Sequence, residues 1–568
     1  MTDKLYGESH QYRKFIIRLL LLAFMAFYCI VPLVIHKGLP YAHDIIFHVF
    51  QADQFNRAIH EGILYPRWVL DLNNGYGSAS FIFYSPLSYY LVSGINILTP
   101  SITIAMITAI WFGIFFSGVT MFVATRKILG GSGSALPAVI YQILPFHLWN
   151  IYIRGTFAEL FAFIWFPLII LFLHKTIESR NKASVVGLSI SYAGLILTHL
   201  VSGFIFTIVI GAYFIYNYFL LKDKKRLLKT LFALILGLGL SSVYLIPVIF
   251  ERKFVQIEYL VNCLICDYKK NFLFMWDKFQ PGLQSFYFPL HVMVILEFIL
   301  FLFIVLLILK NRQIVSNRPH LNFFIFLFLF AFFLTTPLSI PVWDFMPGFP
   351  FLQFPWRWVP MLELSLCFLI GAIFSVEDMS TLRSSTLRRA IIYLLIIISL
   401  ASFVKISRSK IIPNKLIDEI MNPVQIKGII DPVNEYTPIW ATNIKKIISE
   451  VKNDRVLVIS GAALTTITEW KSEKRVITIK ASTPTLLRIS TFYYPGWEAE
   501  IDRHRAQIKI EKESGAMLID IPDGEHTLML KFVDTPLRCY AKIISSGSFF
   551  IIVFLALLSK RTEHKSIN

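Results

Sequence analysis

An acidic residue and a histidine, four positions apart, are the pair in this chain whose types and spacing best suit acid–base chemistry. Asp44 and His48 follow directly after the first apolar stretch, and residues four apart share one face of a helix. A carboxylate beside an imidazole can act as a general base with its partner, or the two can ligate a metal ion. A solvated helix with ordinary polar residues explains the same spacing. Asp44 and His48 are therefore the candidate catalytic residues and also the candidate metal ligands.

Three arginines, a glutamate and a second histidine could complete such a site. Arg67 stands in a Pro-Arg-Trp sequence, and Arg154 and Glu159 stand in a short Arg-Gly-x-x-x-Glu turn. The guanidinium of arginine can donate two parallel hydrogen bonds to one phosphate, so these residues could bind a phosphate. Alternatively, Arg154 and Glu159 form an ion pair at the membrane interface and bind no ligand. Arg357 enters an apolar stretch among aromatic residues, where it either anchors the chain at the interface or faces a lipid headgroup. His199, at a turn between two apolar stretches, is either a hydrogen-bonded structural residue or a ligand.

The composition indicates which elements must position these residues. The chain has 568 residues, of which 56% are hydrophobic and only 16% are charged. A soluble protein carries about 25% charged residues, so this chain cannot cover itself with a water-facing surface. It is predicted to be a polytopic α-helical membrane protein with twelve spans, because twelve apolar stretches have spanning length. The predicted spans are 15–35, 102–125, 134–151, 157–174, 184–199, 200–220, 230–250, 289–309, 321–337, 358–376, 390–404 and 543–559.

Charge asymmetry predicts which loops face the cytoplasm. With the N-terminus inside, every loop predicted to be cytoplasmic is rich in lysine and arginine, which is the positive-inside pattern. Both termini are therefore predicted to be cytoplasmic. Most of the net charge of +18 follows from this topology and from attraction to anionic lipid, so nucleic-acid binding is not expected. Three long segments then lie outside, at 36–80, 251–288 and 405–542.

The segment 405–542 has the charge content and the residue pattern of a folded outside domain. It carries 21 lysines and arginines against 17 acidic residues, and apolar and polar residues alternate over short runs. Asp523-Gly524 marks a tight turn between two such runs. This pattern predicts an antiparallel β-sandwich. The chain thus divides into a transmembrane module over 1–404, a β-rich domain over 405–542, and a final span with a cytoplasmic tail over 543–568.

Two acids and two cysteines leave alternatives open. Glu297 and Glu363 lie inside predicted spans, where an acid is costly and often functional, although either could pair structurally with a nearby arginine. Cys263 and Cys266 form a C-x-x-C sequence in the second long outside segment. They are either a disulfide or two unpaired thiols.

The order of motifs along the chain resembles that of a known group of membrane proteins. The motifs are, in order, Asp44 with His48, Pro66-Arg67-Trp68, Gly75-Tyr76-Gly77, Phe83-Tyr84-Ser85-Pro86, the Arg154-to-Glu159 turn, Gln353-Phe354-Pro355-Trp356-Arg357, Glu435-Tyr436-Thr437-Pro438 and Tyr493-Tyr494-Pro495-Gly496-Trp497. In this order the chain resembles the bacterial membrane proteins of the YfhO type and those labelled 6-pyruvoyl-tetrahydropterin synthase-related. Nothing in the sequence suggests pterin chemistry. Both groups resemble the GT-C superfamily of glycosyltransferases that use polyprenyl-phosphate sugars.

This resemblance implies an inverting glycosyltransferase in the bacterial cytoplasmic membrane. It implies transfer of a sugar from a polyprenyl-phosphate donor to an extracytoplasmic glycan, lipid or protein acceptor, with 36–80 as the catalytic loop. Asp44 would deprotonate or orient the acceptor hydroxyl, and Arg154 and Arg357 would stabilise the leaving phosphate. His48 would orient Asp44, contact the phosphate or bind a metal. Arg67, Glu159 and His199 are the further candidates for binding the donor phosphate or substrate. A divalent ion such as Mg or Mn stays open, because Asp44 lacks the acidic neighbour of the familiar Asp-Glu or Asp-x-Asp pair.

Two other functions fit the same chain. A lipid-linked sugar flippase or other transporter suits twelve spans, although the two halves show no evident similarity and a large outside domain before the last span is atypical. A non-catalytic assembly factor for envelope polymers is the third reading. It predicts that changes at Asp44 and Arg357 are tolerated.

Overall fold

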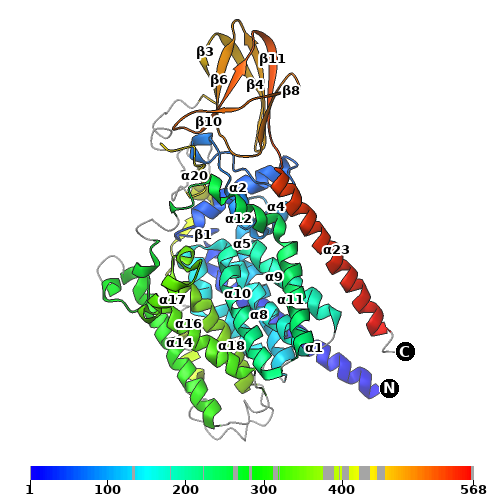
Figure 1. The fold of residues 1–568 in the computed structure, drawn as a ribbon. Coiled ribbons are helices and arrows are strands. Elements are labelled where there is room, and N and C mark those ends of the chain that lie inside the picture. Colours follow the sequence, from blue (N-terminus) through cyan, green and yellow to red (C-terminus); the bar gives the residue numbers. More distant parts are fainter. Residues whose placement is uncertain are drawn as a thin grey trace.

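The computed structural model is a bundle of long helices with a β-rich domain at one end (Figure 1). Both chain ends lie on the side of the bundle away from that domain. The structure describes residues 2–564, apart from 131–134, 179–180, 222, 260–265, 280–283, 311–317, 319, 375–388, 390, 396, 399–407, 421–434 and 444–453.

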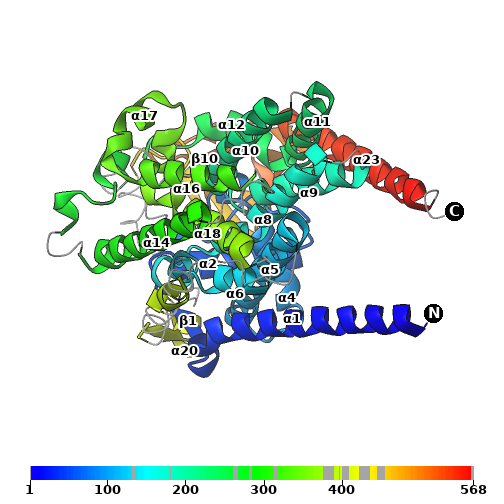
Figure 2. The ribbon, with the colours of Figure 1, turned by 90° about the horizontal axis from the view of Figure 1, so that it is seen from below.

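Seven helices in the described part are long and apolar enough to cross a membrane. They are α1 (Thr2–Ile35), α5 (Ile102–Leu129), α8 (Phe157–Glu178), α10 (Leu200–Leu221), α14 (Gln284–Lys310), α18 (Val359–Phe374) together with the turn η8 (Pro355–Trp358) before it, and α23 (Pro536–His564). All seven coincide with predicted spans. Figure 2 shows α1 and α23 at the edge of the bundle, and both have low burial, as expected for lipid-facing helices.

Two further predicted spans are sharply bent helix pairs. α11 (Lys224–Leu240) is followed at an angle of 72° by a segment that contains α12 (Ser242–Glu251). α16 (Leu321–Thr335) is followed at 91° by a segment that contains α17 (Ile340–Phe345). If each pair is one span, the described residues hold nine candidate spans. A helical membrane protein is therefore confirmed.

The remaining three predicted spans differ from the expectation or are not tested. The stretch 184–199 forms α9 (Lys182–Thr198), an apolar helix shorter than the others. The stretch 134–151 is broken into α6 (Ala135–Ile143), α7 (Pro145–Trp149) and a π-helical turn, η2 (Asn150–Arg154). Proline at position 145 disfavours helical backbone at the residue before it, which ends α6. The stretch 390–404 falls largely outside the described residues, so the count of twelve stays a prediction.

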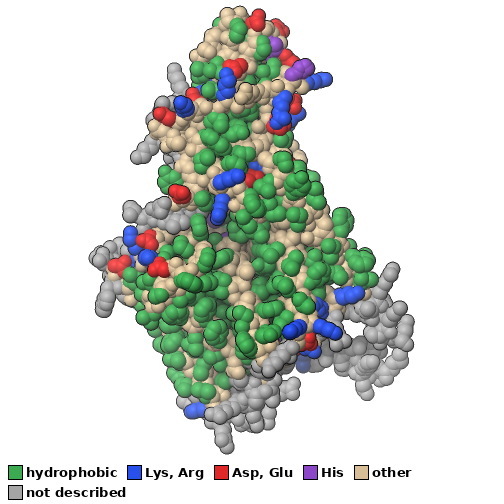
Figure 3. Space-filling model, in the orientation of Figure 1, with side chains coloured by type: hydrophobic (Ala, Val, Ile, Leu, Met, Phe, Trp, Pro, Cys, Tyr) green, Lys and Arg blue, Asp and Glu red, His purple; other side chains and the backbone are tan. Residues whose placement is uncertain are grey.

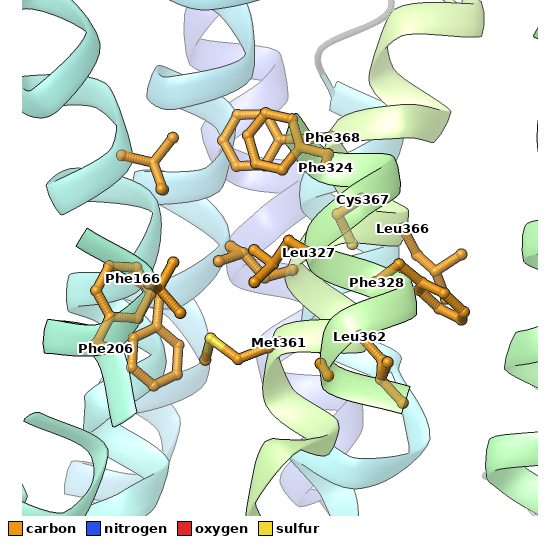
Figure 4. Close-up of a cluster of buried hydrophobic side chains, with 14 of the residues drawn as sticks. Phe166, Phe206, Phe324, Leu327, Phe328, Met361, Leu362, Leu366, Cys367 and Phe368 are labelled. Atoms are coloured by element: carbon orange, nitrogen blue, oxygen red, sulfur yellow. The ribbon is translucent and has the colours of Figure 1, made fainter. Parts of the chain in front are cut away.

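Phenylalanine rings fill much of the space between the helices (Figure 4). Phe324 of α16 stacks on Phe368 of α18 with ring centroids 4.3 Å apart, and Phe166 of α8 stacks on Phe206 of α10 at 4.9 Å. Between helices in lipid there is little hydrophobic driving force, so close packing of this kind holds the bundle together.

The first outside loop contributes short helices between α1 and α5. They are α2 (Ile45–His60), η1 (Asn73–Gly75), α3 (Ser80–Phe83) and α4 (Leu87–Asn96). Ahead of them, β1 (Gly38–Pro40) pairs antiparallel with β2 (Ile411–Pro413), which is followed by α20 (Asn414–Ile420). The chain beyond residue 404 therefore returns to the first outside loop before it forms the β-rich domain.

The β-rich domain contains two antiparallel sheets in its described part. Their strand orders are β3-β6-β10-β9 and β4-β5-β11-β7-β8. Alternate residues of both sheets, such as Ile479, Leu530, Ile489 and Ile519, are buried in one hydrophobic cluster. The β-rich segment is therefore confirmed. The strands are β3 (Val456–Ser460), β4 (Ala463–Lys471), β5 (Lys474–Ala481), β6 (Thr485–Phe492), β7 (Trp497–Ile501), β8 (His504–Ala506), β9 (Lys509–Ile510), β10 (Ala516–Ile521) and β11 (Gly524–Phe532).

Aromatic packing holds this domain on the first outside loop. The Trp68 ring meets Trp497 edge to face with centroids 5.4 Å apart, and Tyr76 lies 5.1 Å from Phe492. Trp68 and Tyr76 belong to the hydrophobic cluster of the β-rich domain. The Pro-Arg-Trp, Gly-Tyr-Gly and Tyr-Tyr-Pro-Gly-Trp motifs thus meet at one interface.

A buried ion pair fixes the start of the last helix at the same interface. Arg538, in the first turn of α23, donates from Nε and Nη2 to the two carboxylate oxygens of Glu251 in α12, each at 2.8 Å. The Tyr494 hydroxyl donates to the same carboxylate at 3.0 Å. The side chains of Arg538 and Glu251 are 0% and 2% exposed, so neither charge is solvated.

Candidate functional site

The backbone around Asp44 is bonded directly to the turn that carries Arg154. The amide of His43 donates to the carbonyl of Ile153 at 3.1 Å, and the amide of Asp44 donates to the carbonyl of Arg154 at 2.8 Å. Gly155 makes this approach possible: its φ is +68°, and a Cβ there would lie 2.8 Å from the Ile45 nitrogen. A carboxylate and a guanidinium from distant parts of the sequence are therefore positioned by main-chain contacts.

Asp44 presents an available carboxylate. It precedes the first residue of α2, its carbonyl accepts from the His48 amide at 3.0 Å, and its side chain makes no capping hydrogen bond. The side chain is exposed. An exposed carboxylate that is not used in capping can accept a proton from a bound hydroxyl.

His48, one turn later, is buried and neutral. Its Nδ1 lies 2.9 Å from the hydroxyl of Tyr89, and its ring packs against Tyr84 and Phe157. Burial lowers the pKa of His48 to about 4, and the nearby charge of Asp44 opposes this shift only in part. At neutral pH the ring carries no charge, so it supports the local packing around Asp44 rather than supplying a cation.

Arg154 is the buried cation of the site. Its Nη1 contacts Glu159 Oε2 at 2.6 Å and Asn150 Oδ1 at 2.8 Å, and its guanidinium lies 4.5 Å from the ring centre of Trp356. Arg154 closes the π-helical turn η2, which ends at Gly155 in the left-handed region. Such turns interrupt regular helices and are frequent at functional sites.

Arg357 and His199 lie within electrostatic range of this ion pair. Charges acting on Arg357 come from Arg154, Glu159 and Asp44, and those acting on His199 come from Glu159, Arg357 and Arg154. The Arg357 Nη1 donates to the carbonyl of Leu352 at 2.9 Å, while its Nε has no hydrogen-bond partner among the described residues. Arg357 therefore retains a donor for an anion.

Tyr84 also belongs to this group, although its residue type and position in the sequence assign it no role. Tyr84 lies in range of Asp44, Arg357 and Glu435, and burial raises its pKa well above the usual value, so its phenol stays protonated. Tyr84 follows α3 and belongs to the Phe-Tyr-Ser-Pro motif. The next residue, Ser85, explains the motif: its hydroxyl accepts from the amide of Leu200 at 3.1 Å and donates to the carbonyl of Ile196 at 3.2 Å, on either side of His199.

Glu435 reaches the site from the chain just ahead of the β-rich domain, almost 400 positions after Asp44. Its neighbour Tyr436 stacks on Phe83 with centroids 5.5 Å apart and planes at 2°. The Glu-Tyr-Thr-Pro motif was visible in the sequence, but no local pattern links it to the first outside loop.

Arg67 lies apart from this group, at the interface with the β-rich domain. Its Nη1 pairs with Asp534 Oδ1 at 2.7 Å, and its amide donates to Glu473 Oε1 at 2.9 Å. The expectation that Arg67 contacts a donor phosphate finds no geometric support. The contacts indicate a structural role, because the interface already supplies the acidic partners of Arg67.

Glu297 and Glu363 face each other inside the helical bundle. Glu363 Oε1 accepts from the amide of Phe146 at 2.7 Å and so holds the start of α7. Neither acid pairs with an arginine in the described residues, which differs from the structural alternative considered for them. Their geometry connects α14 and α18 to the short helix that leads into the Arg154 turn.

The described residues contain no group of three or more His, Cys, Asp or Glu side chains that could hold a metal ion. His48 is buried with one nitrogen on Tyr89, so Asp44 is the accessible oxygen ligand of the candidate pair. These residues do not fit a resident divalent ion. Cys266 is disulfide-bonded, while Cys263 lies outside the described residues.

The family model described as "6-pyruvoyl-tetrahydropterin synthase related domain; membrane protein" matches residues 81–409. The chain belongs to this family. The resemblance inferred from the motifs is thus confirmed at family level. The matched stretch of this 6-pyruvoyl-tetrahydropterin synthase-related protein includes Arg154, Glu159, His199 and Arg357, and it begins after Asp44.

The comparison with curated proteins finds no match. Among solved structures, the chain is similar to the oligosaccharyltransferase of Archaeoglobus fulgidus in its apo form, at 14% identity and a TM-score of 0.42, covering 71% of this chain and 57% of that one. The complex of that enzyme with Zn and sulfate gives 14% identity and a TM-score of 0.37, with 71% and 54% covered. The chain thus spans little more than half of that enzyme, and similarity at this level carries no argument about activity.

Proposed function

We propose that this protein is an inverting membrane glycosyltransferase that moves a sugar from a polyprenyl-phosphate donor to an extracytoplasmic glycan, lipid or protein acceptor. One observation carries the proposal. The exposed carboxylate of Asp44 is bonded through the main chain to the turn of Arg154, and Arg357 lies in electrostatic range of both. A carboxylate that can act as a base and cations that can bind a phosphate are thus held in one site, which supports a role in positioning two substrates.

The proposed reaction assigns each of these groups a step. The Asp44 carboxylate takes the proton of the acceptor hydroxyl while that oxygen forms a bond to the anomeric carbon. The bond from the anomeric carbon to the phosphate oxygen breaks on the opposite face, and its electron pair leaves with the polyprenyl phosphate. Inversion follows from this single displacement.

The two arginines have unequal shares in stabilising the leaving phosphate. Arg154 is already neutralised by Glu159 at 2.6 Å, so it mainly shapes the site and stacks on Trp356. Arg357 has no acidic partner within 4.0 Å among the described residues and keeps its Nε without a partner. We therefore assign Arg357 as the principal cation for the phosphate and His199 as a neighbour that the phosphate could also contact.

The placement of charge supports a membrane orientation for this proposal. A wide hydrophobic band crosses the helical bundle, and charged side chains gather on the β-rich domain and at the opposite end (Figure 3). We propose that the protein lies in the bacterial cytoplasmic membrane with both termini in the cytoplasm and the β-rich domain outside. Asp44 then faces the outer surface, where lipid-linked sugars are used.

Transport of a lipid-linked sugar is the second candidate function. A transporter needs charged groups along a path through the membrane. Of the two intramembrane acids that could line one, Glu363 holds the start of α7 instead, and Glu297 faces Glu363. This contact with α7 gives Glu363 a structural role, which favours glycosyl transfer over transport. A passive assembly factor would not need the exposed carboxylate of Asp44, so this carboxylate favours glycosyl transfer over that function.

Asp44→Asn tests the proposal, with Asp53→Asn on the same helix α2 as the matched control. Protein purified into lipid nanodiscs is incubated with a panel of undecaprenyl-phosphate-linked hexoses and a cell-envelope extract as acceptor. Loss of a general base lowers the rate by about 10²- to 10⁴-fold, so Asp44→Asn should lose transfer while Asp53→Asn retains it. Equal rates for the two variants contradict the role of Asp44. Movement of the labelled lipid across liposomes without transfer supports the transporter.

A further inference from the structure

A buried tyrosine holds the ring of His48 from one side. The hydroxyl of Tyr89, in α4, lies 2.9 Å from Nδ1 of His48, and both side chains are buried. Neither atom has another hydrogen-bond partner among the described residues. The rings of Tyr84 and Phe157 lie 5.7 and 6.2 Å from the imidazole, measured between centroids. The imidazole is therefore enclosed by aromatic rings and has little room to turn.

The contact with Tyr89 decides which nitrogen of the neutral ring carries the proton. A neutral imidazole has one N–H donor and one acceptor nitrogen, whereas a phenol hydroxyl can donate or accept. If Nδ1 donated to Tyr89, the buried hydroxyl proton of Tyr89 would have no acceptor among the described residues, and such orphaned protons are rare in folded proteins. If Tyr89 donates to Nδ1, both groups are satisfied. The proton of the ring is then on Nε2.

The other ring nitrogen, Nε2, is available to a ligand. No described residue forms a hydrogen bond with it, and it is not sealed inside the protein, in contrast to Nε2 of His147, which is buried without a partner. The ring of His48 contacts Phe157, three residues after Arg154, and His48 itself follows Asp44 by one helical turn. The imidazole therefore lies between the loop of the proposed base and the turn that carries Arg154.

We propose that Tyr89 is a positioning residue of the candidate site: its hydroxyl holds His48 in the Nε2–H form, and this N–H donates a hydrogen bond to a phosphate oxygen of the sugar donor. This inference rests on the proposed function and adds a neutral hydrogen-bond donor to the cation of Arg357. Tyr89 acts on the phosphate only through His48.

A phosphate oxygen is the partner that best suits this N–H group. Hydrogen bonds to an ionised acceptor are roughly twice as strong as those between neutral groups. An N–H that is oriented in advance costs no reorganisation when negative charge develops on the leaving phosphate. In the proposed reaction the carboxylate of Asp44 accepts the proton of the acceptor hydroxyl, so the phosphate is the acceptor that remains for Nε2–H.

The tautomer of His48 can be measured without any sugar donor. Full-length protein labelled with ¹⁵N-histidine is placed in lipid nanodiscs, and magic-angle-spinning NMR distinguishes protonated from unprotonated ring nitrogens. The signal of His48 is the one that His48→Gln removes. The wild type should carry the proton on Nε2 at pH 7, and Tyr89→Phe, which keeps the ring and removes the hydroxyl, should show a mixture of both forms. The matched control is Tyr90→Phe on the same helix, because the Tyr90 hydroxyl donates to the carbonyl of Leu64 and should not affect the tautomer.

Farnesyl phosphate is the probe for the phosphate contact, with farnesol as its uncharged match. Farnesyl phosphate should shift the Nε2 signal of the wild type, and farnesol should not. In the transfer assay, Tyr89→Phe should lower kcat about tenfold with a smaller change in KM, as expected for the loss of one hydrogen bond. His48→Gln, whose longer amide can place an N–H near the position of Nε2, should retain more activity than His48→Asn.

Three results would each overturn the inference. They are a wild-type proton on Nδ1, the same tautomer in Tyr89→Phe as in Tyr90→Phe and the wild type, and an equal shift of Nε2 by farnesol and farnesyl phosphate. The expected tautomers and the farnesyl phosphate shift, in a wild-type protein that transfers no sugar, would overturn the proposed function alone.

Discussion

Removing the carboxylate of Glu251 should release the β-rich domain from the transmembrane module. In Glu251→Gln, Arg538 keeps its charge at a position that is 0% exposed, and it loses both charge-assisted bonds of 2.8 Å. Breaking a buried pair by removing one partner costs about 3–5 kcal/mol, because the remaining charge is neither paired nor solvated. The carbonyl of Pro495, which also accepts from Arg538 at 2.8 Å, cannot neutralise that charge.

The measurement is the free energy of domain opening, obtained from hydrogen exchange at the amides of β7 and β11 in nanodiscs. The matched control is Glu525→Gln, which removes an exposed partner of Lys480 and should cost far less, because water screens an exposed pair. The double variant Glu251→Leu with Arg538→Met should recover most of the loss, since apolar groups can replace a buried pair. The reasoning is refuted if Glu251→Gln costs no more than the control, or if the double variant is no more stable than Glu251→Gln.

Three further outcomes follow from the site. Gly155→Ala should abolish transfer and lower the thermal midpoint, because the new Cβ would lie 2.8 Å from the Ile45 nitrogen; an active, stable variant would show that this approach is not needed. The pKa of His48 is lowered to about 4 from 6.5, so neutral His48 favours folding above pH 6.5, and this contribution is lost as the pH falls toward 4. In His48→Gln, the thermal midpoint should therefore depend less on pH between 6.5 and 4. The same pH dependence in the variant and the wild type would contradict this prediction. Glu363→Ala leaves the amide of Phe146 without its acceptor and should cost about 1–3 kcal/mol by thermal unfolding, more than Ser365→Ala on the same helix.

Apolar length and alternation were sufficient to predict most elements of the fold. The seven confirmed span helices are continuous apolar stretches, and the strands of the β-rich domain alternate with a period of two. The stretch 134–151 was misjudged because one proline, Pro145, hardly lowers the mean hydropathy of so apolar a stretch. Its effect on the backbone, which ends α6 at the residue before it, is a matter of geometry.

The candidate site was predicted in part for a similar reason. Asp44, His48, Arg154 and Arg357 could be selected by type and by position relative to the spans. Glu435 could not, because its place beside Tyr84 depends on how a distant segment packs. Arg67, an arginine in a motif next to the candidate base, lies apart from this group and pairs with Asp534.

The interface between Trp68 and Trp497 also sets an order of assembly. The second ring follows the first by about 430 residues, which at about 5–20 residues per second takes the ribosome roughly 20 to 90 seconds. During that time the loop that carries Asp44 has been made, but the surface that supports it has not. A chain interrupted before residue 494 therefore contains every residue of the first loop and lacks its support, so complete synthesis is a condition for an ordered site.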